Sequence, residues 1–171
     1  MSDTVLKNAV TRDVVTLKSP HPTRKRNALV FTTEIPAGAA GSPLHRHSHL
    51  TGTLEVLEGC VTFQVGKTER VLAAGASMSV RSKTLHGFCD ASNSPAVLRR
   101  TATPGVGFEQ FLRGMQASAE AGRANAAGMP RDPRRLPRLL LDTNLHFSGL
   151  PMGLQRVLFS AFAALAPDTT H

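Results

Sequence analysis

The sequence predicts a mainly β protein, in which one antiparallel β-barrel of the jelly-roll kind is followed by C-terminal α-helices. Between residues 14 and 101, short segments rich in β-branched and aromatic residues alternate with turn residues at nearly even intervals. After Thr103-Pro104-Gly105 the apolar residues recur at helical spacing instead. The chain has 171 residues, 41% of them hydrophobic, which suits one domain with one sizeable core.

We expect three stretches along this single domain. Residues 1–27 should form a lead-in of one strand, near Asp13–Lys18, and a loop that contains His21 between two prolines. Residues 28–104 should form the barrel. Residues 105–171 should form a helical extension that packs on the barrel or at a dimer interface.

The barrel strands are recognised by composition and by alternation. Ala28–Ile35 is β-branched and ends at Pro36. Val61–Val65 alternates apolar and polar residues, and the turn at Gly66-Lys67 leads into Thr68–Leu72, which completes a hairpin. Three further short strands are expected, at Ser77–Val80, Gly87–Cys89 and Ala96–Thr101.

Two helices are expected after the barrel. Gly107–Ala121 should be amphipathic and should place its apolar stripe against the barrel; the stripe consists of Phe108, Phe111, Leu112, Met115 and Ala119. Gly122–Pro137 is rich in glycine, proline and arginine, which predicts a linker or mobile loop. A last helix should begin near Pro151, and its apolar stripe is Leu154, Val157, Leu158, Ala161, Phe162 and Leu165.

Composition excludes several classes of protein. The N-terminus has no basic stretch that leads into an apolar run, and the longest apolar stretch, Val157–Ala166, is too short to cross a bilayer. We therefore expect a soluble cytoplasmic protein without a membrane partner. The net charge of +8 arises largely from arginine clusters, but the chain has neither Trp nor Tyr and no DNA-binding motif, so we expect no nucleic-acid partner. Cys60 and Cys89 are too few for a disulfide framework and should be two partly buried thiols.

The chemistry is concentrated in the stretch Pro43–Gly59, which contains three of the seven histidines. In an extended strand, alternate side chains share one face, so His45, His47 and His49 can project to the same side. A neutral imidazole binds a divalent ion at about 2.0 to 2.1 Å, and a mononuclear site needs three or more converging donors. The remaining donor must come from another strand, and His86 is the candidate.

The order of these features resembles the two sequence motifs of the cupins, in particular small single-domain cupins of bacterial type. A His-x-His precedes a strand that ends Val56-Leu57-Glu58-Gly59, and a turn centred on Gly75 precedes the lone His86. The resemblance covers about residues 28–104. It implies a β-barrel in which the first motif supplies His45 and His47 and the second supplies His86 as metal ligands. Cupins are commonly dimers, so the resemblance also implies a homodimer.

One departure from the cupin pattern concerns the metal-binding glutamate. Gly52 stands at that position, so the carboxylate ligand is missing. Glu55 lies an odd number of residues from Gly52 and should face the other side of a regular strand. His49 has the correct parity to replace the glutamate, but we interpret it as a solvent-facing loop histidine. The three remaining histidines form a set that some cupin dioxygenases use with iron.

Three functional classes follow. The first is a cupin that binds one divalent ion (Fe, Mn, Ni or Zn) through His45, His47 and His86 and acts as a metal-dependent, dioxygenase-like oxidoreductase on a small molecule. The second is a non-catalytic cupin that binds a sugar or metabolite. The third is a metal-free isomerase or epimerase with a histidine general base.

No catalytic residue, phosphate loop or organic cofactor site can be named from the sequence. Glu34, Glu55, Gln64 and Arg81 are candidates to face the barrel interior, depending on the register of their strands, and His146 is expected to be a packing residue.

Overall fold

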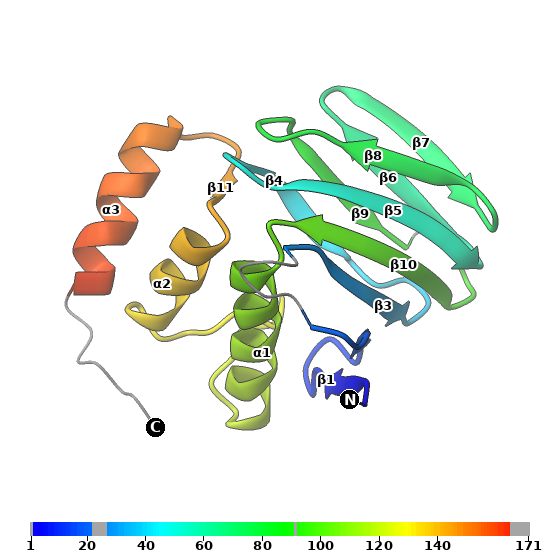
Figure 1. Ribbon diagram of the computed structural model, residues 1–171, viewed down its shortest axis with the longest axis horizontal. Coiled ribbons are helices and arrows are strands. Elements are labelled where there is room, and N and C mark those ends of the chain that lie inside the picture. The colour runs from blue at the N-terminus through cyan, green and yellow to red at the C-terminus, as the bar shows by residue number, and fades with distance from the viewer. Residues whose placement is uncertain (1, 22–26, 91, 165–171) are drawn as a thin grey trace.

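Two antiparallel sheets face each other and make up most of the protein (Figure 1). The computed structural model describes residues 2–21, 27–90 and 92–164. The first sheet contains, in spatial order, β1 (Thr4–Lys7), β2 (Val14–Leu17), β3 (Leu29–Ile35), β10 (Ala96–Thr103), β5 (Thr51–Glu58) and β8 (Ser77–Val80). The second contains β11 (Leu145–Phe147), β4 (Ser42–His47), β9 (His86–Cys89), β6 (Cys60–Val65) and β7 (Thr68–Ala73).

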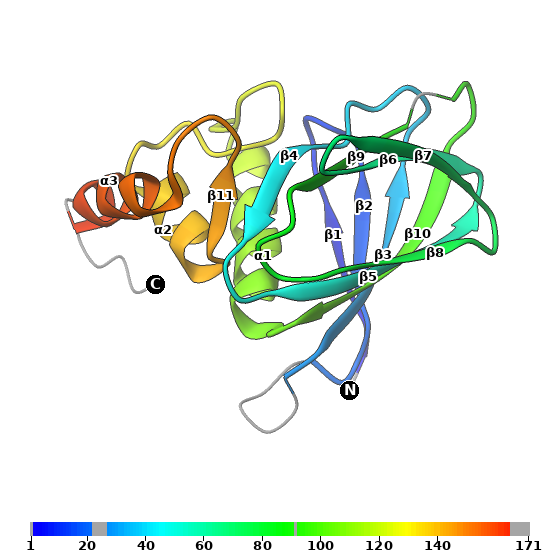
Figure 2. The same ribbon diagram turned by 90° about the horizontal axis from the view of Figure 1, so that it is seen from above.

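The predicted fold class is confirmed: the protein is mainly β, its strands are antiparallel, and helices follow them. Figure 2 shows the two sheets curving around a shared interior, with the helices to one side. Among the described strands, no hydrogen-bonded ladder joins one sheet to the other, so the barrel is a two-sheet jelly roll.

Strand alternation decides which side chains enter this interior. In β3 the residues Leu29, Phe31, Thr33 and Ile35 are buried, whereas Glu34 is exposed. The same alternation buries Leu98 and Ala102 of β10. Most of the interior is apolar and includes Ile35, Leu54, Val56, Val61, Phe63, Leu72, Val80, Phe88, Ala96 and Leu98.

Glycines close two of the strand connections, as the sequence indicates. Gly59 separates β5 from β6 with φ +73°, and Gly75 lies in the turn between β7 and β8 with φ +86°. A Cβ at Gly59 would lie only 2.6 Å from the carbonyl oxygen of Pro95. This turn therefore requires glycine for its conformation and for its close contact.

The N-terminal stretch contains two strands where the sequence predicts one. β1 pairs with β2 along Thr4–Lys7 and extends the first sheet. Four residues are too short a segment to display a strand period, which is why alternation did not reveal β1.

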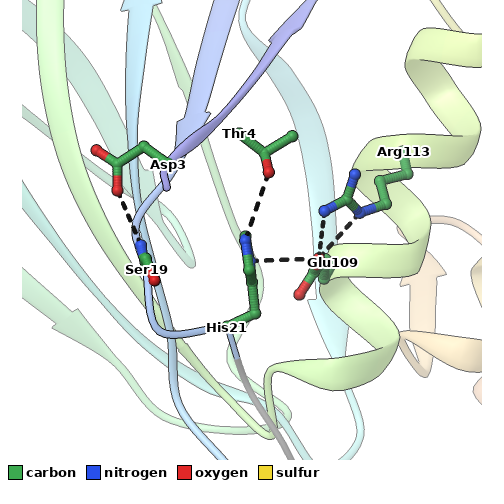
Figure 3. A network of polar contacts seen from close by, with 6 residues as sticks. All are labelled: Asp3, Thr4, Ser19, His21, Glu109 and Arg113. Carbon is green, nitrogen blue, oxygen red and sulfur yellow. Dashed lines mark hydrogen bonds and ion pairs between the residues drawn. The ribbon is translucent and has the colours of Figure 1, made fainter. Parts of the chain in front are cut away.

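Figure 3 shows how this N-terminal segment is attached to the helical side of the protein. Asp3 Oδ1 accepts a hydrogen bond from the Ser19 backbone N–H at 2.9 Å. His21 lies 3.4 Å from Thr4 Oγ1 and 3.4 Å from Glu109 Oε1 on α1 (Val106–Glu120), and Glu109 also pairs with Arg113. His21, which we expected to be a simple loop residue, therefore connects the β1–β2 segment to α1.

The helical extension contains two elements that the sequence did not predict, a helix and the strand β11. α1 agrees with the predicted helix within one residue at each end. A further helix, α2 (Arg135–Asp142), begins inside the predicted linker. Pro137 is the third residue of α2, where its missing N–H has no intrahelical partner to lose, so its presence does not exclude a helix.

The last helix, α3 (Met152–Ala164), begins beside Pro151 as predicted. It contacts α2 and β11 and buries Gln155, whose side chain hydrogen-bonds to the backbone of Phe147 and Leu150. The apolar stripe predicted to be packed is instead exposed in the single chain, at Leu154, Val157, Leu158 and Phe162; Leu165 lies outside the described residues. None of the helices in the described ranges combines the length and apolar character needed to span a membrane.

Candidate metal centre

Three histidines converge inside the barrel, and strand geometry explains why. Side chains alternate along β4, so His45 and His47 point inward and are buried, whereas Arg46 between them is only half-buried. β9 lies beside β4 and pairs His86 with His45. The ring centroids of His45 and His86 are 4.4 Å apart, those of His45 and His47 are 5.0 Å apart, and those of His47 and His86 are 5.8 Å apart.

The nitrogen atoms of these rings are close enough to share an ion. One ring nitrogen from each histidine lies within 4.8 Å of the corresponding atoms of the other two. His45 and His47 are buried and His86 is half-buried. The three side chains could therefore hold a metal ion, as the sequence predicts.

The backbone determines which nitrogen of each ring faces the centre. Nδ1 of His45 lies 2.7 Å from the carbonyl oxygen of Pro43, Nδ1 of His47 lies 3.0 Å from that of Thr143, and Nδ1 of His86 lies 2.9 Å from that of Thr84. A carbonyl oxygen can only accept, so each Nδ1 must donate its N–H. In the neutral ring, Nε2 then carries the free lone pair, which is the tautomer that a metal requires.

The carbonyl oxygen that accepts from His47 Nδ1 belongs to a distant part of the chain. Thr143 follows α2 directly, and β11 then pairs with β4 so that Leu145 stands opposite His47. The helical extension thus orients one of the three histidines. The sequence did not reveal this contact, because β11 has only three residues and 96 positions separate the two partners.

Burial keeps the three histidines neutral. Desolvation, followed by the neighbouring His86 and His47 charges, lowers the pKa of His45 to about 3. Desolvation also lowers the pKa of His47 to about 4, and it lowers the pKa of His86. From the ordinary pKa of histidine, near 6.5, we expect protons to compete with a metal below about pH 6. The lowered pKa values correct this expectation, because proton competition in the folded state begins at more acidic pH.

The missing glutamate leaves a space beside the histidines. Gly52 lies on the inward face of β5 and lines a cavity of about 40 Å³ together with His47 and His86. Glu55 lies across the sheet from Arg99 and pairs with it at 3.1 Å, so it faces away from the centre as parity predicts. His49 is exposed and follows the end of β4, outside the three-histidine cluster.

The other polar residues considered from the sequence lie away from the centre. Glu34 and Arg81 are exposed, and the Gln64 side chain donates to the Gly66 carbonyl. His146 is buried on β11, opposite Arg46, and its Nδ1 lies 3.0 Å from the Asn144 carbonyl. The two cysteines are free and half-buried, which confirms the prediction for them.

One residue at the centre was missed. Arg100 of β10 stands opposite Phe31 of β3, in the inward row that also contains Leu98 and Ala102. Its guanidinium carbon lies 5.3 Å from the ring centroid of Phe31, 5.2 Å from Phe88 and 5.9 Å from Phe108. Desolvation lowers its pKa to about 10, so it remains charged at neutral pH. A charged residue in the apolar phase of a strand was the signal that could have identified it.

A larger cavity begins at this arginine and runs between the barrel and α1. Its volume is about 310 Å³, within the range of small-molecule sites. His45 and Arg100 lie on its wall, and the β1–β2 segment, α1 and β11 supply most of the remaining surface. The three-histidine centre therefore borders both the small cavity of about 40 Å³ and this ligand-sized cavity.

Residues 31–99 match the family model described as a cupin domain. Among solved structures, the chain is similar to an RmlC-like cupin from Shewanella frigidimarina NCIMB 400, with 21% identity, 61% of this chain and 86% of that chain covered, and a TM-score of 0.51. A sugar phosphate isomerase of the cupin superfamily from Silicibacter pomeroyi DSS-3 gives 17% identity, coverage of 56% and 61%, and a TM-score of 0.48. The Cupin_2 domain of an XRE family transcriptional regulator from Enterobacter cloacae gives 15% identity, coverage of 53% and 95%, and a TM-score of 0.47. A search of curated proteins finds no match.

Proposed function

We propose that this chain, whose residues 31–99 match the cupin domain model, is a cupin that binds one divalent metal ion through His45, His47 and His86 and acts as a metal-dependent oxygenase on a small molecule. The observation that carries this proposal is the hydrogen bonding of the three rings. All three Nδ1 atoms face backbone carbonyls, so all three Nε2 lone pairs are free for one ion.

The donor set fits a first-row transition metal. Imidazole nitrogen suits Fe, Ni and Zn, and Mn is compatible with a mixed nitrogen and oxygen shell. An ion on three neutral histidines keeps its full charge and open positions, which suits the binding of an anionic substrate together with dioxygen. The chain's own residues hold the rings neutral and in one tautomer, and Phe31, Phe63 and Phe108 line the small cavity at the centre and limit water there.

The pKa values disfavour the metal-free isomerase or epimerase. A general base works best when its pKa lies near the operating pH. His45 and His47, with pKa values of about 3 and 4, are weak bases at neutral pH. They are better suited to donating a lone pair to an ion than to accepting a proton from a substrate.

A non-catalytic, ligand-binding cupin is the second candidate. The cavity of about 310 Å³ beside His45 favours it, because that space would accept a ligand whether or not a reaction follows. Neither candidate requires a residue outside the described site.

Metal analysis tests the proposal. The purified protein, loaded separately with Fe²⁺, Mn²⁺, Ni²⁺ and Zn²⁺ and freed of excess metal, should retain about one ion per chain by elemental analysis for at least one of these metals. His47→Ala should lose most of that metal, whereas His49→Ala, which alters an exposed histidine on the same segment, should retain it. A wild-type protein that holds no stoichiometric ion at neutral pH would refute the metal site and leave the ligand-binding candidate.

A separate measurement distinguishes an oxygenase from a metal-dependent binder. Fe²⁺-loaded protein should consume dioxygen when a productive small molecule is added, and the His47→Ala protein should not. Stoichiometric metal binding without dioxygen consumption across a panel of small organic acids and sugars would favour the non-catalytic candidate.

A further inference from the structure

Arg100 carries a half-buried positive charge that no acid among the described residues balances. Within the described ranges, Arg100 has no ion pair and no hydrogen bond; its contacts are the three phenyl rings. Cation–π contacts stabilise the charge but do not use the five N–H donors of the guanidinium. A desolvated cation with free donors is costly unless an anion pairs with it.

The neighbouring residue shows that this arrangement is specific to the inward face. Arg99 faces the opposite side of β10, is largely exposed, and pairs with Glu55 at 3.1 Å. Of these two adjacent arginines, the outward one has a carboxylate partner and the inward one has none among the described residues.

The unbalanced charge of Arg100 lies beside residue 52, the position at which the glutamate of the cupin pattern is missing. Gly52 and Arg100 line the same small cavity of about 40 Å³. A carboxylate at residue 52 would stand near the guanidinium as well as near the histidines. Its absence leaves room for a carboxylate brought by a ligand.

The larger cavity indicates what is attached to that carboxylate. Its wall is mainly apolar and includes Leu6, Val15, Phe111, Leu112, Met115 and Phe147. Asp13 is the one acid on that wall among the described residues, and it accepts a hydrogen bond from Thr11. Thr33 and Ser42 are also among the lining residues, and their hydroxyl groups have no hydrogen-bond partner within the described structure. An apolar body with a few polar contacts fits this space.

We propose that Arg100 is the receptor for the carboxylate of an amphipathic carboxylic acid, whose apolar body fills the cavity between the barrel and α1. The proposal rests on the proposed function only in placing this carboxylate next to the three-histidine centre. A single guanidinium matches the single charge of a carboxylate and can bind it with two parallel N–H···O bonds. The substrate class is therefore a medium-sized monocarboxylate, not a neutral sugar.

Calorimetric titration with octanoate and its neutral counterpart octan-1-ol tests the proposal. The metal-free full-length wild type should bind octanoate more tightly than octan-1-ol. Arg100→Met should lose about 10- to 100-fold in affinity for octanoate, the range for one charge-assisted pair, and should keep its affinity for octan-1-ol. Arg99→Met is the matched control and should behave like the wild type.

Two further variants keep the proposal testable if Arg100→Met does not fold. Arg100→Lys retains the charge without the planar fork and should show an intermediate preference for octanoate. Gly52→Glu places a carboxylate on the same cavity and should reduce octanoate binding while leaving octan-1-ol binding in place.

The outcomes separate this proposal from the metal site. A wild type that binds neither probe, or binds both equally, overturns the Arg100 assignment. The assignment is also overturned if Arg100→Lys prefers octanoate as strongly as the wild type does and Gly52→Glu binds octanoate with unchanged affinity. A preference for octanoate in a protein that holds no stoichiometric metal leaves the Arg100 assignment intact and refutes the proposed metal function. A protein that binds metal but shows no preference for octanoate keeps the metal site and refutes the Arg100 assignment.

Discussion

Gly52 on β5 and Arg100 on β10 line the same small cavity, next to His47 and His86. The first residue lacks the side chain that would complete a metal shell, and the second carries a charge without a partner among the described residues. The chemistry of the centre depends on this pair, because an ion and Arg100 together would place three positive charges in one buried region that contains only neutral ligands.

Gly52→Glu should therefore strengthen metal binding. The new carboxylate adds a fourth ligand and balances charge, so we expect the dissociation constant for Zn²⁺ to fall at least about tenfold, equivalent to about 1.4 kcal/mol. A Cβ at residue 52 would lie 3.2 Å from the Thr101 carbonyl oxygen, so β10 must yield slightly. Competition titration with a chromogenic chelator measures the effect. Thr51→Glu, at an exposed position on the same strand and outside the cavity lining, is the control, and an equal effect of both variants would contradict the prediction.

Metal and carboxylate should bind cooperatively. A ligand carboxylate reduces the repulsion between the ion and Arg100, so saturating octanoate should raise the affinity for Zn²⁺, and Zn²⁺ should raise the affinity for octanoate by the same factor. We expect a factor of about 5 to 150, the usual range of coupling between two sites. Calorimetry of each ligand with and without the other measures it. Coupling that is equally large in Arg100→Met would show that the arginine is not responsible.

The stability of the metal-free protein should fall as the pH falls below about 6.5. The unfolded chain binds protons on its histidines near pH 6.5, whereas the folded chain resists protonation of His45 until about pH 3 and of His47 until about pH 4. The stabilisation is complete above pH 6.5 and is lost toward pH 4, with a slope of about 1.4 kcal/mol per pH unit for each such histidine.

Urea unfolding in the presence of a chelator at pH 7, 6 and 5 measures this dependence. This window lies above the ordinary titration range of Asp and Glu. His45→Leu should reduce the slope by about 1.4 kcal/mol per pH unit. Equal stability of the wild type at pH 7 and pH 5 would show that the three rings are not held neutral by burial.

The exposed stripe on α3 should form the interface of the expected homodimer. Val157 is 66% exposed and Phe162 is 46% exposed, and α3 packs against α2 and β11 through its other face. Removing such side chains from water at an interface is favourable. Light scattering should give the mass of two chains for the full-length protein.

Val157→Glu should then shift that mass toward one chain, because a charge would be buried at the centre of the stripe. Arg156→Glu, a change of charge at the neighbouring exposed position, is the control and should have the smaller effect. A wild type that is monomeric at micromolar concentration would refute the interface, and the homodimer with it.

The cupin resemblance, and not local periodicity, placed His86 with His45 and His47. The sequence by itself determined the jelly-roll class, the barrel strands and the shared face of His45 and His47. These features depend on local periodicity: alternate positions of one strand share a face, glycine allows the turns at Gly59 and Gly75, and helical spacing begins after Pro104. The parity of β5 likewise put Gly52 and Glu55 on opposite faces without any knowledge of the partner strands.

Only the tertiary structure decided the features that depend on contacts between distant segments. The sequence did not reveal α2, because it begins in a proline- and arginine-rich stretch, or β11, because it has only three residues. The Thr143 carbonyl that orients His47 lies between these two elements and was therefore missed as well. The charge state of the histidines depends on burial, which no local pattern measures. The lone charge of Arg100 depends on which side chains of β3, β9 and α1 meet around it, and the exposure of the α3 stripe depends on which face packs on α2. Local sequence sets the direction of each side chain, but only packing decides which groups it meets there and whether its charge finds a partner.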